Sequence, residues 1–136
     1  MIIIGEKISI IAKKVREAMM KRDPKPIQEL ADEQWKAGAH YIDVNTGPAE
    51  EKGEELMTWM VTSIQEKVSL PLCLDTTNPK ALEAGLKAHN NQWGRALINS
   101  TSNEPERYVM LELAAKYKCQ VIGLTLGKGG LPADAE

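Results

Sequence analysis

Residues 71–79 read Pro-Leu-Cys-Leu-Asp-Thr-Thr-Asn-Pro, and this stretch decides the fold. The apolar run Leu72–Leu74 is short and unbroken, which is typical of a strand buried on both faces of a parallel sheet. The run ends at Asp75, and Asn78-Pro79 then supplies a helix N-cap and a proline for the first helical position. The stretch therefore predicts a strand that passes through a polar turn into a helix ending near Ala88.

The same unit recurs along the chain. Apolar runs predict four further strands, at Ile2–Ile4, Tyr41–Asn45, Ala96–Asn99 and Val121–Leu126. The unbroken run Ile2–Ile4 is, like Leu72–Leu74, typical of a strand buried on both faces. Apolar residues at helical spacing predict further helices, with faces carried by Ile11–Met19, Ile27–Trp35, Met57–Val68 and Tyr108–Ala115. The last helix is expected to open with a capping box at Asn103–Glu106. This alternation predicts a parallel sheet with right-handed crossovers.

Two arrangements fit the alternation: an open, doubly wound sheet and a (β/α)8 barrel. A barrel averages roughly 250 residues, whereas this sequence has 136. Length alone therefore slightly favours the open, flavodoxin-like sheet. That sheet would need a fifth covering helix, but the residues after the last predicted strand are broken by Gly127, Gly129, Gly130 and Pro132.

The composition fits one globular domain over residues 1–136. Hydrophobic residues make up 43% and the net charge is -2, which excludes a disordered chain. No apolar run approaches the roughly 20 residues of a membrane span, and a pI near 5.8 argues against a nucleic-acid partner. Cys73 and Cys119 belong to no CxxC pair, and the N-terminus does not resemble a signal peptide, so a cytoplasmic protein is expected. His40 and His89 have no neighbouring ligands, so no metal site is expected.

Polar side chains stand where the predicted strands end. Glu6 follows the first strand, Asp43 and Asn45 end the second, Asp75 ends the third and Asn99 ends the fourth. Because the carboxyl ends of parallel strands form the binding face of α/β folds, these side chains predict one polar pocket. A carboxylate and an amide together suit the N–C–N edge of a flat heterocycle. The plainer alternative is that such residues cap helices or satisfy backbone groups.

At these positions the sequence resembles a known family. The motifs that carry the resemblance are Ile3–Ile8, Tyr41–Pro48, Leu72–Thr76, Ile98–Thr101 and Ile122–Thr125. They are similar to those of the pterin-binding methyltransferases, above all methyltetrahydrofolate:corrinoid protein methyltransferase. Dihydropteroate synthase and the folate domain of cobalamin-dependent methionine synthase are wider relatives. The resemblance spans nearly the whole chain and is specific as a set.

The resemblance implies a partial (β/α)8 TIM barrel, with about the first five strands and four helical crossovers, in place of the open sheet. Residues 1–136 would form the N-terminal portion of a pterin-binding domain. In the family, the residues matching Asp75 and Asn99 hydrogen-bond the pterin, and Glu6 matches the glutamate after strand one. The family continues that first motif with Asn, where this chain has Ser9. A second pterin-binding aspartate and a proton-handling asparagine would lie beyond Glu136, so the catalytic residues are expected there.

The implied reaction transfers the N5 methyl group of methyltetrahydrofolate to the cobalt of a corrinoid carried by a corrinoid/iron–sulfur-type partner protein. A tertiary amine is a poor leaving group, so N5 needs a proton or a strong hydrogen bond. Two alternatives stay open: a non-catalytic pterin- or folate-binding module, and a half-barrel that assembles with another chain. Because an open half-barrel exposes its edge strands, a homo-oligomer such as a homodimer is expected.

Overall fold

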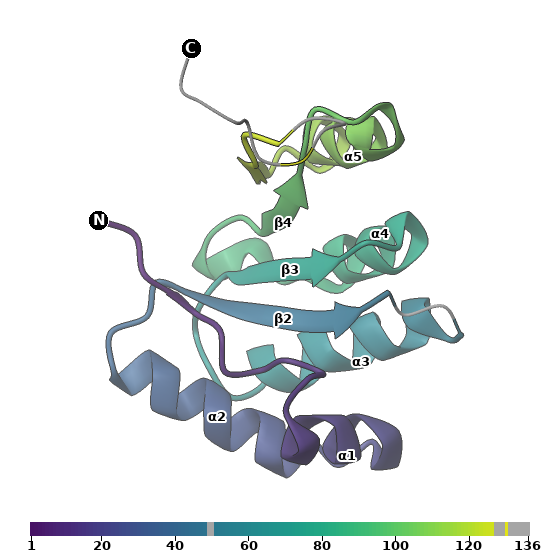
Figure 1. The fold of residues 1–136 in the computed structure, drawn as a ribbon. Helices are drawn as coiled ribbons and strands as arrows, with labels where there is room; N and C mark the ends of the chain where they lie inside the picture. The colour runs from purple at the N-terminus through teal and green to yellow at the C-terminus, as the bar shows by residue number, and fades with distance from the viewer. Residues whose placement is uncertain (49–50, 127–129, 131–136) are drawn as a thin grey trace.

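The computed structural model describes residues 1–48, 51–126 and 130, arranged as Figure 1 shows. The strands are β1 (Ile4–Gly5), β2 (Tyr41–Gly47), β3 (Leu72–Thr76), β4 (Leu97–Thr101) and β5 (Gln120–Gly123). The α-helices are α1 (Lys13–Lys21), α2 (Pro24–Lys36), α3 (Gly53–Gln65), α4 (Pro79–Ala88) and α5 (Tyr108–Tyr117). Two 3-10 helices, η1 (Asn91–Trp93) and η2 (Pro105–Arg107), precede β4 and α5. The predicted alternation of strands and helices is therefore present.

The five strands form one parallel sheet in the order β1-β2-β3-β4-β5. A doubly wound sheet reverses its strand order at a switch point, whereas a barrel adds each strand beside the previous one. The sequential order confirms the partial barrel, and the preference for an open sheet drawn from chain length is wrong. The chain length gave the wrong fold because the number of residues does not determine on which side of the previous strand each new strand is added.

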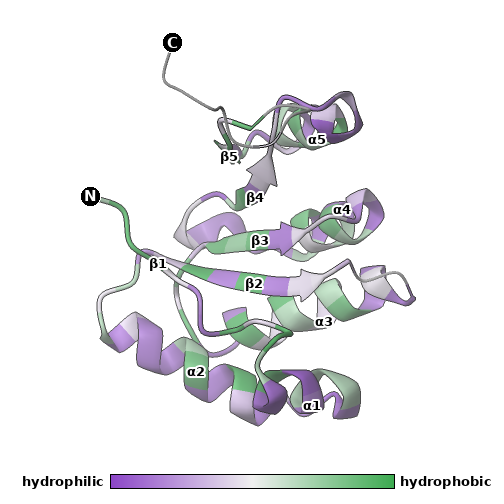
Figure 2. Cartoon of the chain, viewed as in Figure 1, coloured by the Kyte–Doolittle hydropathy of each residue, from purple (hydrophilic) through white to green (hydrophobic). Residues whose placement is uncertain are grey.

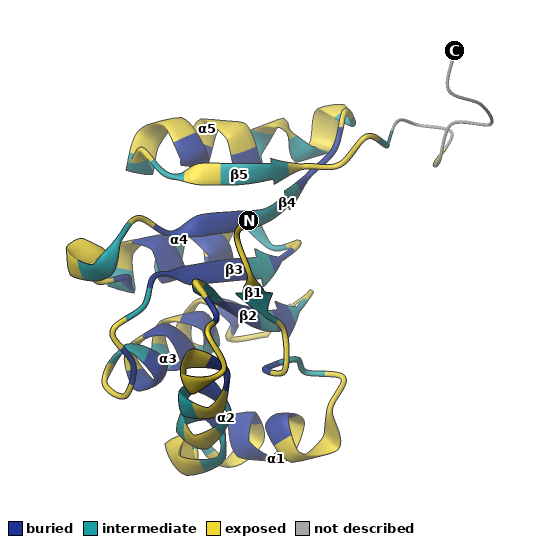
Figure 3. Ribbon diagram, turned by 90° about the vertical axis from the view of Figure 1, so that its left-hand side faces the viewer, coloured by how far each residue is buried: buried dark blue, intermediate teal, exposed yellow. Residues whose placement is uncertain are grey.

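The helices cover one face of this sheet (Figure 1). Val44, Leu74 and Ile98 point toward the helices, and each is at most 1% exposed. Met57 and Met60 of α3 are fully buried in the same core. Figure 3 shows the buried residues along the strands and the inner sides of the helices, with exposed residues on the outer helix surfaces. The residues that alternate with the core positions therefore point to the opposite face, which in a barrel is the interior.

Helices α3 and α4 approach each other closely at Gly85. A Cβ atom there would lie 2.6 Å from Cγ of Met57 and 3.0 Å from Cδ1 of Leu74. Only a residue without a side chain fits without moving these buried neighbours. The contact fixes the position of α4 against β3, the strand that carries Asp75.

Local signals placed one helix start correctly and another wrongly. Asn78 caps α4 as predicted, since its side chain accepts hydrogen bonds from two backbone N–H groups of the first turn. The capping box predicted at Asn103–Glu106 is wrong. The Asn103 side chain instead accepts a hydrogen bond from the Tyr108 hydroxyl, and η2 forms before α5 begins. The early Pro105 allows this tighter turn because it needs no hydrogen bond at its own nitrogen.

The two outer strands are shorter than predicted. β1 begins at Ile4, and Ile2 and Ile3 are 65% and 45% exposed, so the predicted burial of this run on both faces is wrong. The physical reason is that β1 lies at the edge of the sheet and has β2 as its neighbour on one side. β5 ends at Gly123 rather than at Leu126. The predicted chain break after β5 falls, except for Gly130, on residues 127–129 and 131–136, outside the described residues.

Hydropathy follows this architecture (Figure 2). Apolar residues lie along the strands, interrupted in β2 by hydrophilic bands, and on the inner helix faces, and hydrophilic residues cover the outer helix surfaces. Within β3 the colour changes from hydrophobic to hydrophilic toward the carboxyl end of the strand. The polar end of β3 is therefore a distinct feature of an otherwise apolar strand.

Within the described part of the chain, no helix combines the length and the apolar character that a membrane span requires.

Candidate functional site

Three of the predicted site residues stand in one row across the sheet. Asn45 of β2 pairs with Asp75 of β3, which in turn pairs with Asn99 of β4. Residues paired across a parallel sheet project their side chains from the same face. All three alternate with buried core positions, so they point to the face opposite the helices. The structure thus brings Asp75 and Asn99 side by side at the carboxyl end of the sheet.

The fourth residue, Asp43, lies one step lower on the same face, beside Cys73. The Asn99 side chain donates a hydrogen bond from Nδ2 to Oδ2 of Asp43 at 3.1 Å. Asp43 and Asn99 belong to β2 and β4, which β3 separates, so their backbones would lie about 10 Å apart in a flat sheet. The side chains meet because the sheet curls toward this face. This hydrogen bond across β3 therefore indicates that the face is concave, as the inner surface of a barrel is.

Asn45 and Asp75 form a second pair. Nδ2 of Asn45 donates to Oδ2 of Asp75, and Oδ1 of Asn45 accepts a hydrogen bond from the backbone N–H of Gly47 at 3.0 Å. Both ends of the Asn45 amide are therefore engaged by the protein. Asp75 keeps Oδ1, for which the described residues provide no hydrogen-bond donor. Oδ1 of Asp75 is therefore an acceptor on the inner face of the sheet, and Asn45 holds the other carboxylate oxygen in place.

Burial controls the charge of these carboxyl groups. Asp43 is only 3% exposed, and this burial raises its pKa to about 6, against hydrogen bonds from Asn99 and Cys73 that lower it. Burial also raises the pKa of Asp75, with Asn45 opposing and the nearby Glu6 charge adding to the rise. The Cys73 thiol is buried and its pKa is raised as well, so it stays protonated. The site therefore presents mainly acceptor oxygens, with Asp43 ionised at neutral pH.

The residues after β1 contribute in different ways. Glu6 is exposed and acts on Asp43 and Asp75 through its charge, which raises the pKa of both. Lys7 turns toward α2 instead, where its Nζ lies 3.7 Å from Oε2 of Glu33. Ser9, the departure from the family motif, forms a backbone bridge with Asn45. Glu6 thus shares the acidic end of the sheet with the four bonded residues.

Sequence analysis missed Arg107. It lies in η2, in the connection that follows β4, and its positive charge lowers the pKa of Asp75. The available signal was its place in a βα loop, since such loops surround the carboxyl ends of the strands. The described residues contain no cluster of three or more His, Cys, Asp or Glu side chains that could hold a metal ion.

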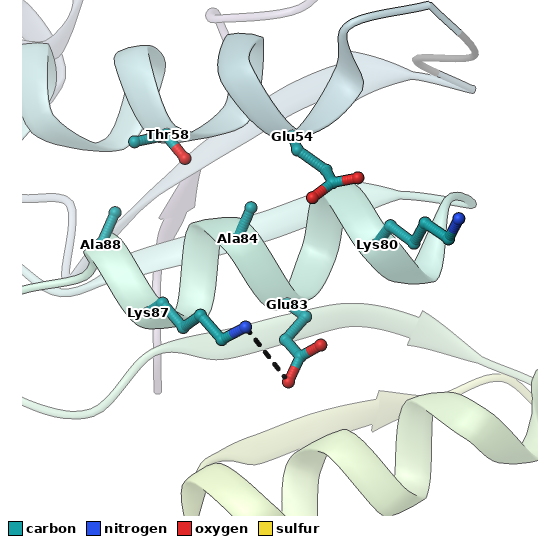
Figure 4. A pocket seen from close by; sticks show the side chains of 7 residues that line it. All are labelled: Glu54, Thr58, Lys80, Glu83, Ala84, Lys87 and Ala88. Carbon is teal, nitrogen blue, oxygen red and sulfur yellow. Dashed lines mark ion pairs between the residues drawn. The ribbon is translucent and has the colours of Figure 1, made fainter.

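A separate groove lies on the outer surface, between α3 and α4 (Figure 4). It encloses about 370 Å³, and its polar lining includes Glu54, Lys80, Glu83 and Lys87. The Glu83 carboxylate is already engaged by Lys116 at 2.7 Å and by the Tyr117 hydroxyl at 2.9 Å. The groove contains none of the predicted site residues. We therefore assign the candidate site to the strand ends, where acceptor oxygens converge.

Comparison with known proteins identifies the family to which the chain belongs. Residues 12–132 match the pterin binding enzyme family. The chain belongs to this family. Membership of the pterin binding family, whose fold is a TIM barrel, confirms the fold inferred from the strand order and the family resemblance drawn from the sequence.

Three relatives cover nearly all of the chain. The methylcorrinoid:tetrahydrofolate methyltransferase of Eubacterium limosum is 35% identical over 139 residues, which cover 100% of this chain and 50% of that protein. The methionine synthase of Mycobacterium leprae (strain TN) is 32% identical over 136 residues, or 95% of this chain and 11% of that protein. The methionine synthase of Mycobacterium tuberculosis (strain ATCC 25618 / H37Rv) is 30% identical over 142 residues, or 99% and 12%. The chain thus spans half or less of the length of these curated relatives.

Proposed function

We propose that this chain forms the pterin-binding part of a methyltransferase that moves a methyl group between N5 of tetrahydrofolate and the cobalt of a corrinoid. The corrinoid is carried by a separate partner protein. The observation that carries the proposal is the pair Asp75 and Asn99, which are register partners at the carboxyl end of the sheet. The family match and the methyltransferase names of the relatives support it.

The donor and acceptor pattern fits a pterin. The pyrimidinone edge of a reduced pterin carries ring N–H and amino donors. Asp75 offers Oδ1, and Asn99 uses its Nδ2 on Asp43, which leaves its own Oδ1 as an acceptor. Two adjacent acceptors bind a donor-rich edge, and the carboxylate makes the stronger, charge-assisted hydrogen bond. Glu6 adds negative charge at the same rim.

The chemistry of the transfer requires control of a proton at N5. When methyltetrahydrofolate is the donor, the N5–CH3 bond breaks and the amine nitrogen must gain a proton or a strong hydrogen bond. The corrinoid, when bound in its partner, supplies the cobalt that exchanges the methyl group. The residues of this chain hold and orient the ring edge remote from N5. That edge is the same in both directions of transfer, including the direction named for the Eubacterium limosum relative.

A titration tests the proposed site. We expect methyltetrahydrofolate to bind the unaltered chain and Asp75→Ala to weaken binding by about 10- to 100-fold, because a charge-assisted hydrogen bond contributes roughly 1.5–3 kcal/mol. Asp32→Ala is the matched control, since Asp32 lies on α2 and is an ion-pair partner of Lys36. Isothermal titration calorimetry measures both. Unchanged affinity in Asp75→Ala would remove Asp75 from the site.

Methyl transfer is tested separately. The chain, loaded with methyltetrahydrofolate, is mixed with a corrinoid protein reduced to the cob(I)alamin state, and methylcobalamin formation is followed by absorbance. Transfer supports the methyltransferase. Binding without transfer supports the alternative, a pterin-binding module that does not catalyse the reaction by itself.

A further inference from the structure

Asp43 is buried beneath the proposed pterin site and does not reach its outer rim. It is 3% exposed, whereas Asn99 and Asp75 above it are partly exposed. A buried, ionised carboxylate is unfavourable unless hydrogen bonds satisfy it. Among the described residues, the Asn99 amide donates to it at 3.1 Å, and the adjacent Cys73 thiol also lowers its pKa. Burial still raises the pKa of Asp43 despite these interactions, so the buried carboxylate is unfavourable for the fold and packing alone does not explain its presence.

The amide of Asn99 can occupy its position in two orientations that differ by exchange of Oδ1 and Nδ2. In the observed one, Nδ2 donates to Asp43. In the other, Oδ1 of Asn99 would face a carboxylate oxygen, and two acceptors without a proton between them repel each other. The ionised carboxylate therefore excludes the second orientation. As a result, Oδ1 of Asn99 is the atom available to a ligand.

We propose that Asp43 is a positioning residue that fixes the orientation of the Asn99 amide, so that Asn99 offers its carbonyl oxygen and the site accepts only a donor-bearing ring edge. This inference rests on the proposed function for the identity of the ligand. The contact between Asp43 and Asn99 does not depend on it. Asn45 plays the corresponding part for Asp75, because its amide is held at both ends.

The charged and titratable neighbours of Asp43 set the pH range in which this control operates. They are Glu6 beyond β1, and Cys73 and Asp75 on β3, with Arg107 of η2 acting on Asp75. Protonated Asp43 could itself donate to Oδ1 of Asn99 and permit the reversed amide. The reversed amide would direct its NH2 group at the donors of the ring edge. We therefore expect ligand affinity to fall as Asp43 becomes protonated.

A double-mutant cycle tests whether Asp43 acts through Asn99. We expect Asp43→Ala to weaken methyltetrahydrofolate binding by about 10-fold, because an unpaired amide loses its fixed orientation. In an Asn99→Ala background the same change should have almost no effect. Asp43→Asn can donate to Oδ1 of Asn99 as well as accept from its Nδ2, as protonated Asp43 can. It should therefore permit both amide orientations, weaken binding and remove the pH dependence of the affinity near pH 6. Equal losses in both backgrounds, or no loss in either, would overturn the proposal.

A measurement without ligand keeps the contact testable by itself. In 15N-resolved NMR spectra, the side-chain NH2 signals of Asn99 should shift as the pH passes through about 6. They should move in Asp43→Ala and lose the pH-dependent shift in Asp43→Asn. Signals that ignore both changes would contradict the proposal, and Asp43→Asn covers the case in which Asp43→Ala does not fold. If the unaltered chain binds no pterin, the proposed function fails while the spectra still decide the contact.

Discussion

At the scale of the residue, Asp43 lowers the stability of the fold at neutral pH. Its pKa rises from a model-compound value of 3.8 to about 6 in the folded state. When the folded-state pKa of a carboxyl group is higher than its unfolded-state pKa, deprotonation of the group favours the unfolded state. The folded protein is therefore most stable, relative to the unfolded chain, at a pH where the group is protonated in both the folded and the unfolded state. The contribution of the group to stability is complete below about pH 4 and is lost as the pH rises through 6.

Asp43→Asn should therefore stabilise the chain at neutral pH. The free energy of unfolding of this variant, relative to the unaltered chain, should increase between pH 4 and pH 6. It should level off about 3 kcal/mol above its acid value, since one pKa unit corresponds to about 1.4 kcal/mol. Urea unfolding of both proteins from pH 4 to pH 8 measures this difference, and titration of the other groups largely cancels. A difference that does not vary with pH would contradict the assignment.

The residues of the site show what a single sequence can and cannot predict. Asp75 and Asn99 were predictable because each ends an apolar run, and parallel strands bring such ends together. The contact between Asp43 and Asn99 was not, because it crosses β3 and depends on the curl of the sheet. Arg107 was missed for a similar reason, since its effect on Asp75 depends on how the loop after β4 folds back.

At the scale of the element, the packing of α4 depends on Gly85. Alanine is intrinsically more favourable than glycine in a helix by about 1 kcal/mol. Here, however, the added methyl group would meet buried atoms of Met57 and Leu74. Overpacking of a core costs roughly 1–3 kcal/mol. We expect the packing cost to exceed the helical gain.

Gly85→Ala should accordingly lower the free energy of unfolding by up to about 2 kcal/mol, the packing cost less the helical gain. Met57→Ala is the matched background, because it removes the atom at 2.6 Å. In that background Gly85→Ala should be neutral or stabilising. Urea midpoints of the four proteins complete the cycle. A stabilising Gly85→Ala in the unaltered chain would show that the helices can separate freely.

Elements also differ in how far local sequence determines them. The start of α4 follows from Asn78-Pro79, because the cap and the proline act within one turn. The start of α5 does not follow from Asn103–Glu106, where the Tyr108 hydroxyl engages the asparagine that the capping box required. The length of β1 depends on its edge position, which no local pattern contains.

At the scale of the whole molecule, the described part of the chain leaves one edge of β1 and one edge of β5 without a neighbouring strand. Ile2 and Ile3 beside β1 are 65% and 45% exposed, and Leu124 after β5 is 40% exposed. Unpaired edges flanked by apolar side chains favour pairing with other strands. A second copy of the chain offers the same edges.

We therefore expect the 136-residue chain to self-associate. Size-exclusion chromatography with light scattering should give a mass of at least twice the 15.0 kDa of one chain. Ile3→Lys should shift the population toward monomer, because charge on an edge strand opposes strand pairing. Ile11→Lys is the matched control, since Ile11 is 82% exposed but lies outside both edge strands. A monomer of 15.0 kDa that unfolds cooperatively would show that the half-barrel tolerates its open edges, and would contradict self-association.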